Sequence, residues 1–120
     1  SRVTNDFSTF AFDQAFGADT TQQQLFGTAG TGACDHFLDG HNVSVMAYGQ
    51  TGAGKTFTML GDLGGWQEKA GEVRENAGLV PRALSYIFEG VRRQQEGGMQ
   101  VKVKVCLIEI YNETVVDLLS

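Results

Sequence analysis

The 120-residue chain has little cysteine, proline or positive charge. Its two cysteines, Cys34 and Cys106, lie far apart and outside any C-x-x-C pair, which favours two buried free thiols over a disulfide or a metal site. His36 and His41 are five residues apart, a spacing that does not put two metal ligands on one helix face, so we expect no metal cluster there.

Basic residues are outnumbered, nine against 14 acidic ones, and the net charge is −5. This balance argues against a polybasic tether, so we expect no nucleic-acid partner. No apolar run is long enough to span a bilayer and the first residues carry no signal-peptide pattern, so we expect no membrane partner either. With 42% hydrophobic residues, the composition is that of a globular protein of one small domain, or of a piece of a larger one.

Hydrophobic periodicity predicts strands and helices in alternation. Alternating or apolar runs predict strands at residues 10–12, 43–48 and 101–108. The run at 43–48 is apolar enough to be buried on both faces. Helical periodicity covers residues 22–38 and 79–93. The apolar stripe of the first helix consists of Leu25, Ala29, Ala33 and Phe37.

Between the helices, residues 61–78 are glycine-rich and without periodicity, which predicts a long exposed loop. Trp66 in this loop is interpreted as an anchor of the loop in preference to a ligand contact. Near the end of the chain, residues 111–114 form a predicted turn, and 115–119 a last short strand or the start of a helix.

The strongest motif is a complete match to the phosphate-loop pattern G-x-x-x-x-G-K-[ST]. Its residues are Gly49, Gln50, Thr51, Gly52, Ala53, Gly54, Lys55 and Thr56. The predicted strand at 43–48 precedes the motif and a predicted helix begins at Lys55, which is the strand–loop–helix context that the motif requires. The alternative is a glycine-rich turn with a solvated lysine, and the flanking elements count against it.

The chemistry of such a loop is the binding of a nucleoside triphosphate. Its glycines let consecutive N–H groups converge on phosphate oxygens, and the following helix adds its partial positive charge. Lys55 would reach the β- and γ-phosphates, and the Thr56 hydroxyl would coordinate Mg²⁺. Asp117 follows an apolar pair and is a candidate second Mg²⁺ partner, though this pattern is common. Residue patterns alone predict triphosphate binding and go no further.

Several blocks, in order along the chain, together resemble the kinesin motor domain. Residues 10–16 resemble F-x-F-D-x-V-F. Residues 40–59 match G-[YF]-N-x-x-[IV]-x-A-Y-G-Q-T-G-[SA]-G-K-T-[YF]-T-M, except that His41 replaces the aromatic residue. Residues 78–82 resemble G-[IL]-[IV]-P-R, and residues 109–113 with 117–119 resemble E-I-Y-N-E…D-L-L. The pair Gln50-Thr51 favours kinesin over myosin, whose loop usually has G-E-S-G-A-G-K-T.

The resemblance implies an α/β fold of the phosphate-loop NTPase type. This is a three-layer sandwich with a central, largely parallel mixed sheet between helices, of which residues 1–120 would be a partial, single domain. It implies a microtubule-based motor of the cytoplasmic cytoskeleton that uses ATP and Mg²⁺, with the microtubule as partner. Residues 61–78 would be the family's variable loop, and Asp117 falls in the D-L-L stretch and so loses the Mg²⁺ role.

The family's γ-phosphate-sensing segments have no counterpart in the 120 residues, so we expect no catalytic residue here and an inactive isolated fragment. Two alternatives remain. One is a non-hydrolysing motor-like module that binds nucleotide or a partner. The weaker one is an unrelated phosphate-loop kinase, which would leave the E-I-Y-N-E block without an explanation. Downstream segments of the gene would distinguish the motor from the module.

Overall fold

The computed structural model describes residues 2–4, 8–62 and 73–119. The chain divides into two compact units, residues 1–90 and 91–120. The boundary falls within helix α4 (Leu79–Glu96). Each unit is described by itself.

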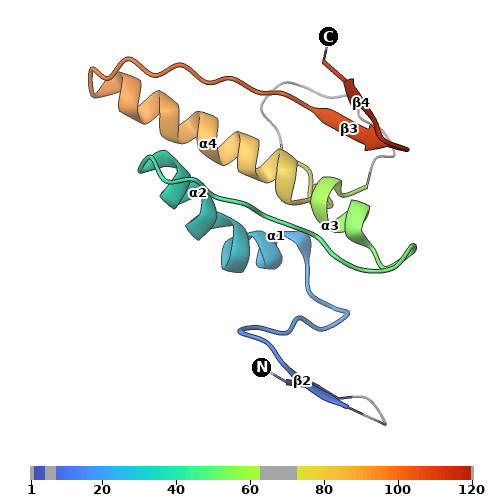
Figure 1. The fold of residues 1–120 in the computed structure, drawn as a ribbon. Helices are drawn as coiled ribbons and strands as arrows, with labels where there is room; N and C mark the ends of the chain where they lie inside the picture. The colour runs from blue at the N-terminus through green and yellow to red at the C-terminus, as the bar shows by residue number, and fades with distance from the viewer. Residues whose placement is uncertain (1, 5–7, 63–72, 120) are drawn as a thin grey trace. The chain divides into compact units, whose positions relative to one another are not determined.

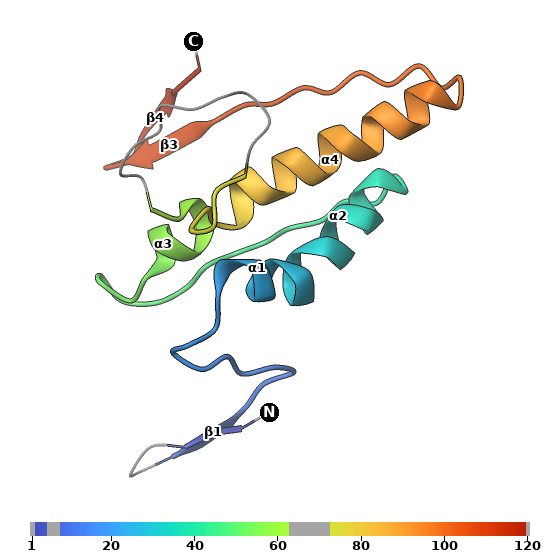
Figure 2. The ribbon, with the colours of Figure 1, turned by 180° about the vertical axis from the view of Figure 1, so that it is seen from behind.

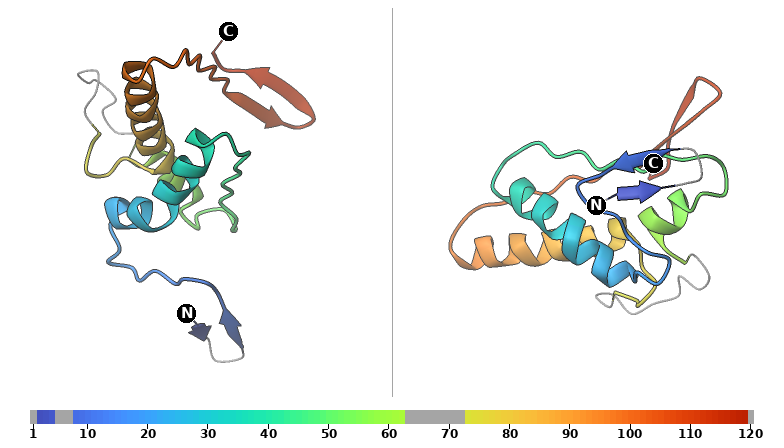
Figure 3. Two further views of the ribbon diagram at one scale, coloured as in Figure 1. Left: turned by 90° about the vertical axis from the view of Figure 1, so that its left-hand side faces the viewer. Right: turned by 90° about the horizontal axis from the view of Figure 1, so that it is seen from below.

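The first unit begins with a small antiparallel sheet of β1 (Arg2–Thr4) and β2 (Thr9–Ala11), coloured blue in Figure 3. Val3 lies opposite Phe10 in its register. The strand predicted at residues 10–12 is therefore confirmed, one residue earlier than expected.

The helix predicted at residues 22–38 is confirmed, with a change of winding in its middle. It consists of α1 (Gln22–Leu25), a π-helical turn η1 (Phe26–Gly30) and α2 (Thr31–Leu38). Thr21 begins it with a capping box: the Gln24 N–H donates to Thr21 Oγ1 at 3.2 Å, and the Thr21 N–H donates to Gln24 Oε1 at 2.9 Å.

The buried stripe of this helix is not the one that the apolar pattern indicated. Leu25 and Ala33 are half-buried, and Ala29 and Phe37 are exposed. The buried residues lie on the adjacent stripe, also at four-residue intervals: Gln22, Phe26, Gly30 and Cys34. Hydrophobicity alone favours the wrong stripe, because the buried Gln22 and Gly30 do not count as apolar residues.

Helix α4 confirms the helix predicted at residues 79–93, with Pro81 in the first turn as expected. Its first part lies beside α2 (Figures 1 and 2). The Tyr86 hydroxyl donates to Asp35 Oδ1 at 2.8 Å, and the rings of Tyr86 and Phe26 meet edge to face with centroids 6.0 Å apart. An apolar groove of about 200 Å³ lies next to this contact, with Ala33, Val45 and Ile87 among its lining residues.

The strand predicted at residues 43–48 is wrong for the described structure. Residues 41–49 have no regular secondary structure, and Met46 and Tyr48 are 90% and 102% exposed. A strand exists only when a neighbouring strand takes up its N–H and C=O groups. The strands among the described residues form two two-stranded sheets, and neither includes this segment.

The described ends of the loop predicted at 61–78 are held together. Gly61 and Ala77 form an isolated antiparallel bridge, next to which the Asp62 N–H donates to Asn76 O and the Gly78 N–H to Leu60 O, each at 3.1 Å. Trp66, for which an anchoring role was predicted, lies outside the described residues.

Arg82, in the first turns of α4, joins several parts of this unit. The residue is buried, with a relative exposure of 7%. Its Nε donates to Ala77 O at 2.9 Å, and its Nη2 donates to the carbonyl oxygens of Arg74 and Glu75 at 3.0 and 2.7 Å. Its Nη1 donates to Gln23 Oε1 on α1. The planar fork of the guanidinium thus fixes the segment before α4 and ties it to α1.

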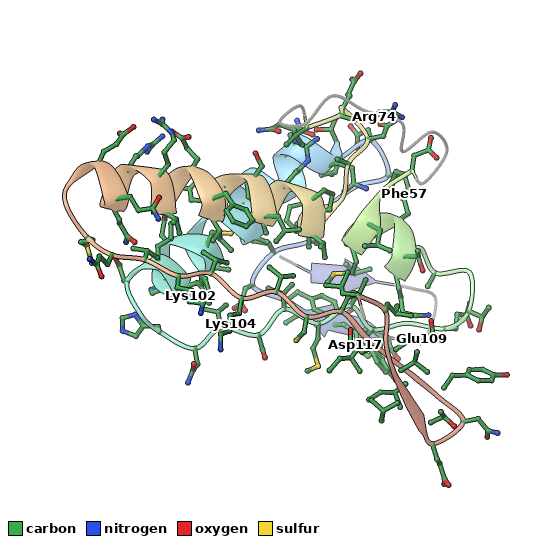
Figure 4. The ribbon with its side chains drawn as sticks, turned by 90° about the horizontal axis from the view of Figure 1, so that it is seen from above. Phe57, Arg74, Lys102, Lys104, Glu109 and Asp117 are labelled. Carbon is green, nitrogen blue, oxygen red and sulfur yellow. The ribbon has the colours of Figure 1, made fainter. Side chains whose placement is uncertain are left out.

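The second unit ends in a hairpin of β3 (Ile108–Tyr111) and β4 (Thr114–Asp117), the red strands in Figure 3. Asn112 and Glu113 form the predicted turn, with φ of 48° and 63°, which suits a type I′ hairpin. The last predicted element is therefore a strand. Figure 4 marks Glu109 and Asp117 on the hairpin, and Lys102 and Lys104 on the segment that precedes it.

The strand predicted at 101–108 is found only at its last residue, and the reason is again the missing neighbour: residues 101–107 have no strand partner among the described residues. Cys106, in this segment, is exposed, so burial was predicted correctly for Cys34 alone. The described sheets are small and antiparallel, and the three-layer sandwich is not seen in them. None of the described helices is long and apolar enough to cross a membrane.

The two thiols should differ in reactivity. Burial, with a further contribution from the charge of Asp35, raises the pKa of the Cys34 thiol. Because only the thiolate is nucleophilic, the higher pKa lowers the reactive fraction at pH 8, and burial restricts access. In the folded chain we expect iodoacetamide to alkylate Cys106 at least about tenfold faster than Cys34, as measured by peptide mass spectrometry. The rates should converge in urea; equal rates without urea would contradict the burial of Cys34.

Replacing Arg82 by leucine should destabilise the fold. The change leaves four hydrogen-bond acceptors without their donor, and we expect the free energy of unfolding in urea to fall by about 3 kcal/mol. Arg82→Lys should recover only part of it, because one ammonium cannot reproduce the fork. The matched control is Arg92→Leu, which removes an exposed pair with Glu96 and should cost about 0.5 kcal/mol or less. Equal losses in the two variants would disprove the anchoring role.

Candidate functional site

The glycine-rich loop leads directly into α3 (Lys55–Leu60), so the helix predicted to begin at Lys55 is confirmed. Two of its glycines have the left-handed backbone that disfavours any side chain: Gly52 with φ 81°, and Gly54, the N-cap, with φ 87°. Between them, the Ala53 N–H donates to Gln50 O at 3.1 Å and closes a turn. Glycine at these positions therefore determines the path of the loop.

The loop and the first turn of α3 present backbone donors. The bond from Thr58 N–H to Gly54 O, at 2.8 Å, closes the first turn of the helix. The N–H groups of Lys55 and Thr56 precede it, so they have no acceptor within the helix. Residues 50–54 are exposed. Free N–H groups at the positive end of a helix, next to an exposed loop, suit an anion such as a phosphate.

Lys55 folds back over the start of the loop. Its half-buried side chain donates from Nζ to Gly49 O at 2.8 Å and to Gln50 O at 2.9 Å. Both acceptors are neutral carbonyl groups, so these bonds hold the ammonium in place without cancelling its charge. The structure thus brings Lys55 together with Gly49 and Gln50 and leaves a positive charge at the loop.

Thr56, the predicted Mg²⁺ ligand, is exposed in the first turn of α3, next to Lys55. A hydroxyl oxygen is a hard donor of the kind that Mg²⁺ binds, so the residues present fit a metal-bound phosphate. Thr51 completes the predicted set and is exposed at the tip of the loop. Asp117, which was set aside, accepts from the Leu119 N–H at 2.9 Å and so stabilises its own turn.

The two histidines lie closer than their spacing suggested, with ring centroids 5.9 Å apart. The Nδ1 of His36 is 2.8 Å from Gly32 O, and that of His41 is 3.3 Å from His36 O. Among the described residues, no three His, Cys, Asp or Glu side chains form a group that could hold a metal ion.

Sequence reasoning missed Gln22, which contacts the helix behind the loop. Its Nε2 donates to Phe57 O of α3 at 2.7 Å, and its side chain is buried. Figure 4 marks Phe57 on α3 and Arg74 on the segment held by Arg82. The sequence signal for Gln22 was its position four residues before Phe26, on the same helical stripe as Cys34.

A glycine-rich loop that opens into a helix at Gly-Lys-Thr, with a lysine over its backbone, defines a phosphate-loop protein. The family of kinesin motor domains matches residues 1–120. The chain is 41% identical over 112 residues to the kinesin-like protein KIN-5A of Arabidopsis thaliana, and 42% identical over 112 residues to KIF11-B of Xenopus laevis. Each alignment covers 93% of the chain and 10% of the relative. The chain belongs to the kinesin motor domain family.

Solved structures agree with this assignment. The chain is similar to Drosophila Kin10/NOD in complex with divalent manganese and ADP, with a TM-score of 0.75 and 35% identity. It is also similar to Drosophila NOD docked with bovine tubulin into a map of the nucleotide-free NOD–microtubule complex, with a TM-score of 0.76 and 34% identity. Each match covers 99% of the chain and 40% of the other. The chain spans about a tenth of the length of each of the two curated relatives named above.

The glycine conformations lead to a matched pair of variants. Gly54→Ala places a side chain on left-handed backbone, which should lower the free energy of unfolding by about 1 kcal/mol and weaken phosphate binding. Gly27→Ala, in η1, meets no atom within 4 Å and should raise stability by up to about 1 kcal/mol. Urea unfolding and titration with ADP measure both effects. Equal behaviour of the two variants would contradict the special role of Gly54.

Proposed function

We propose that residues 49–56 bind the phosphates of Mg-ATP, and that these 120 residues are the phosphate-loop part of a motor that hydrolyses ATP and moves along microtubules. The observation that carries the proposal is the position of Lys55, whose ammonium lies over a loop of exposed backbone at the start of a helix. The kinesin relatives support the motor role, and the neighbour that binds manganese and ADP supports a nucleotide with a divalent metal.

In this proposal the protein's own groups bind and orient the triphosphate. Lys55 Nζ exchanges the carbonyl oxygens of Gly49 and Gln50 for oxygens of the β- and γ-phosphates. The N–H groups that begin α3 would donate to the same phosphates, and the Thr56 hydroxyl would hold Mg²⁺. The metal, when bound, neutralises charge on the phosphate oxygens. No covalent intermediate is needed, because positioning and charge stabilisation are the main contributions to phosphoryl transfer.

We further propose that residues 43–48 and 101–107 become strands of a central, largely parallel mixed sheet once neighbouring strands are present. Helices α1, α2 and α4 would then cover one face of a three-layer sandwich. The exposure of Val45 and Leu107, 50% and 49%, supports this, because both side chains belong to apolar runs that a sheet would bury. The partner would be the microtubule, and the location the cytoplasmic cytoskeleton.

Lys55→Ala tests the site in the motor protein that carries these residues. Loss of the ammonium removes a donor to the transferring phosphate, so we expect microtubule-stimulated ATP turnover to fall at least about 100-fold. The matched control is Lys104→Ala, an exposed lysine of the second unit, which should leave turnover within about twofold of the unsubstituted protein.

The outcomes separate the candidate functions. Unchanged turnover in Lys55→Ala would refute the site. Nucleotide binding without any turnover in the unsubstituted protein would point to the non-hydrolysing module. No binding of ADP or ATP at all would refute the nucleotide site itself.

A further inference from the structure

The first turn of α1 contains a buried amide that contacts the helix of the phosphate loop. Gln22 has a relative exposure of 6%, and its Nε2 donates to Phe57 O at 2.7 Å. This bond joins residues 35 positions apart in the sequence. Phe57 O also accepts from the Gly61 N–H at 2.8 Å, at the end of α3. The amide therefore holds the carbonyl group around which the last turn of α3 is built.

The position of α3 determines the position of the proposed phosphate contacts. Lys55 and Thr56 directly precede Phe57 in this six-residue helix. A helix moves as a stiff unit because each turn is hydrogen-bonded to the next. A displacement of the Phe57 carbonyl would therefore move the Lys55 ammonium and the Thr56 hydroxyl with it.

The neighbouring residue makes the second connection of this turn. Gln23 Oε1 accepts from Arg82, and Arg82 also holds the carbonyl groups of Arg74, Glu75 and Ala77. Gln22 and Gln23 are adjacent, so a single turn of α1 connects α3 with the segment before α4. These contacts all lie within the first unit.

Packing and stability alone do not account for Gln22. Its Oε1 is buried without a hydrogen-bond partner among the described residues. A buried acceptor without a donor lowers stability, and an apolar side chain of similar length would fill the same space without this cost. The contribution that such an apolar side chain could not make is the bond to α3.

We propose that Gln22 is a positioning residue of the phosphate loop, and that Gln22 and Gln23 couple the segment at 73–78 to nucleotide affinity. The inference rests on the proposed function, because it concerns the same nucleotide site. It adds a route by which a change in the segment before α4 alters nucleotide binding.

Gln22→Met in the complete motor protein tests the positioning role. It removes the amide nitrogen and the amide oxygen of the side chain at nearly constant volume, so we expect a melting temperature within about 3 °C of the unsubstituted protein. The Kd for a fluorescent ADP analogue and the KM for ATP should rise about three- to tenfold, with kcat at saturating ATP unchanged. The matched control is Gln95→Met, which removes the hydrogen bond from the Gln95 side-chain amide to the Val101 carbonyl in the second unit. This variant should change neither the Kd nor the KM.

A double-mutant cycle tests the coupling. Gln23→Met should raise the Kd about threefold when Gln22 is present and add nothing when Gln22 is already methionine. Unchanged Kd in a folded Gln22→Met variant would overturn the positioning role, and losses that multiply would overturn the coupling. If Gln22→Met does not fold, Gln23→Met alone tests the proposal, because the Gln23 side chain is exposed. An unchanged Kd in that variant overturns the proposal. An unsubstituted protein that binds no nucleotide refutes the proposed function as well.

Discussion

The buried guanidinium of Arg82 is the interaction on which the arrangement of the first unit depends. Its five N–H donors suit a cluster of carbonyl groups that no apolar side chain could satisfy. The guanidinium donates to three carbonyl oxygens of residues 74–77, a segment that belongs to no helix or strand. Because the same group bonds Gln23, the start of α4 is fixed relative to α1. The bridge between Gly61 and Ala77 then joins the segment before α4 to the residue that follows α3.

The two helical segments and the segments at 43–48 and 101–107 behave differently for one physical reason. A helix satisfies its backbone within itself, so residues 22–38 and 79–93 are helical as their periodicity predicts. An extended segment needs a neighbour for its backbone groups. Residues 43–48 and 101–107 have the composition of strands and no strand partner among the described residues, so they lack regular secondary structure and are largely exposed. The hairpin at 108–117 forms because its partner is adjacent in sequence.

The same distinction explains how much the sequence predicts. The loop at 49–54 and the helix after it follow from a contiguous motif, because Gly52, Gly54 and Lys55 act through local backbone geometry. The turn at 112–113 was likewise predictable from local residues. Gln22 and Arg82 were not, since their partners are up to 59 residues away and no spacing rule encodes such contacts. The buried stripe of the first helix was predicted wrongly for a related reason. In the sequence, a glutamine that will be buried cannot be told from one that will lie on the surface.

The path of the glycine-rich loop depends on residues of the motif itself, whereas the helix after it is held by a residue far away in the sequence. Gly52 and Gly54 determine the path of the loop, and the Lys55 ammonium already lies against two neutral carbonyl oxygens. In the proposed function, exchanging these carbonyl oxygens for anionic phosphate oxygens would give shorter, charge-assisted hydrogen bonds with little reorganisation. The helix that carries Lys55 is six residues long, too short to be stable by itself in water. In the proposed function, the contact of this helix with Gln22 would therefore support nucleotide binding, even though Gln22 lies outside the phosphate-loop motif.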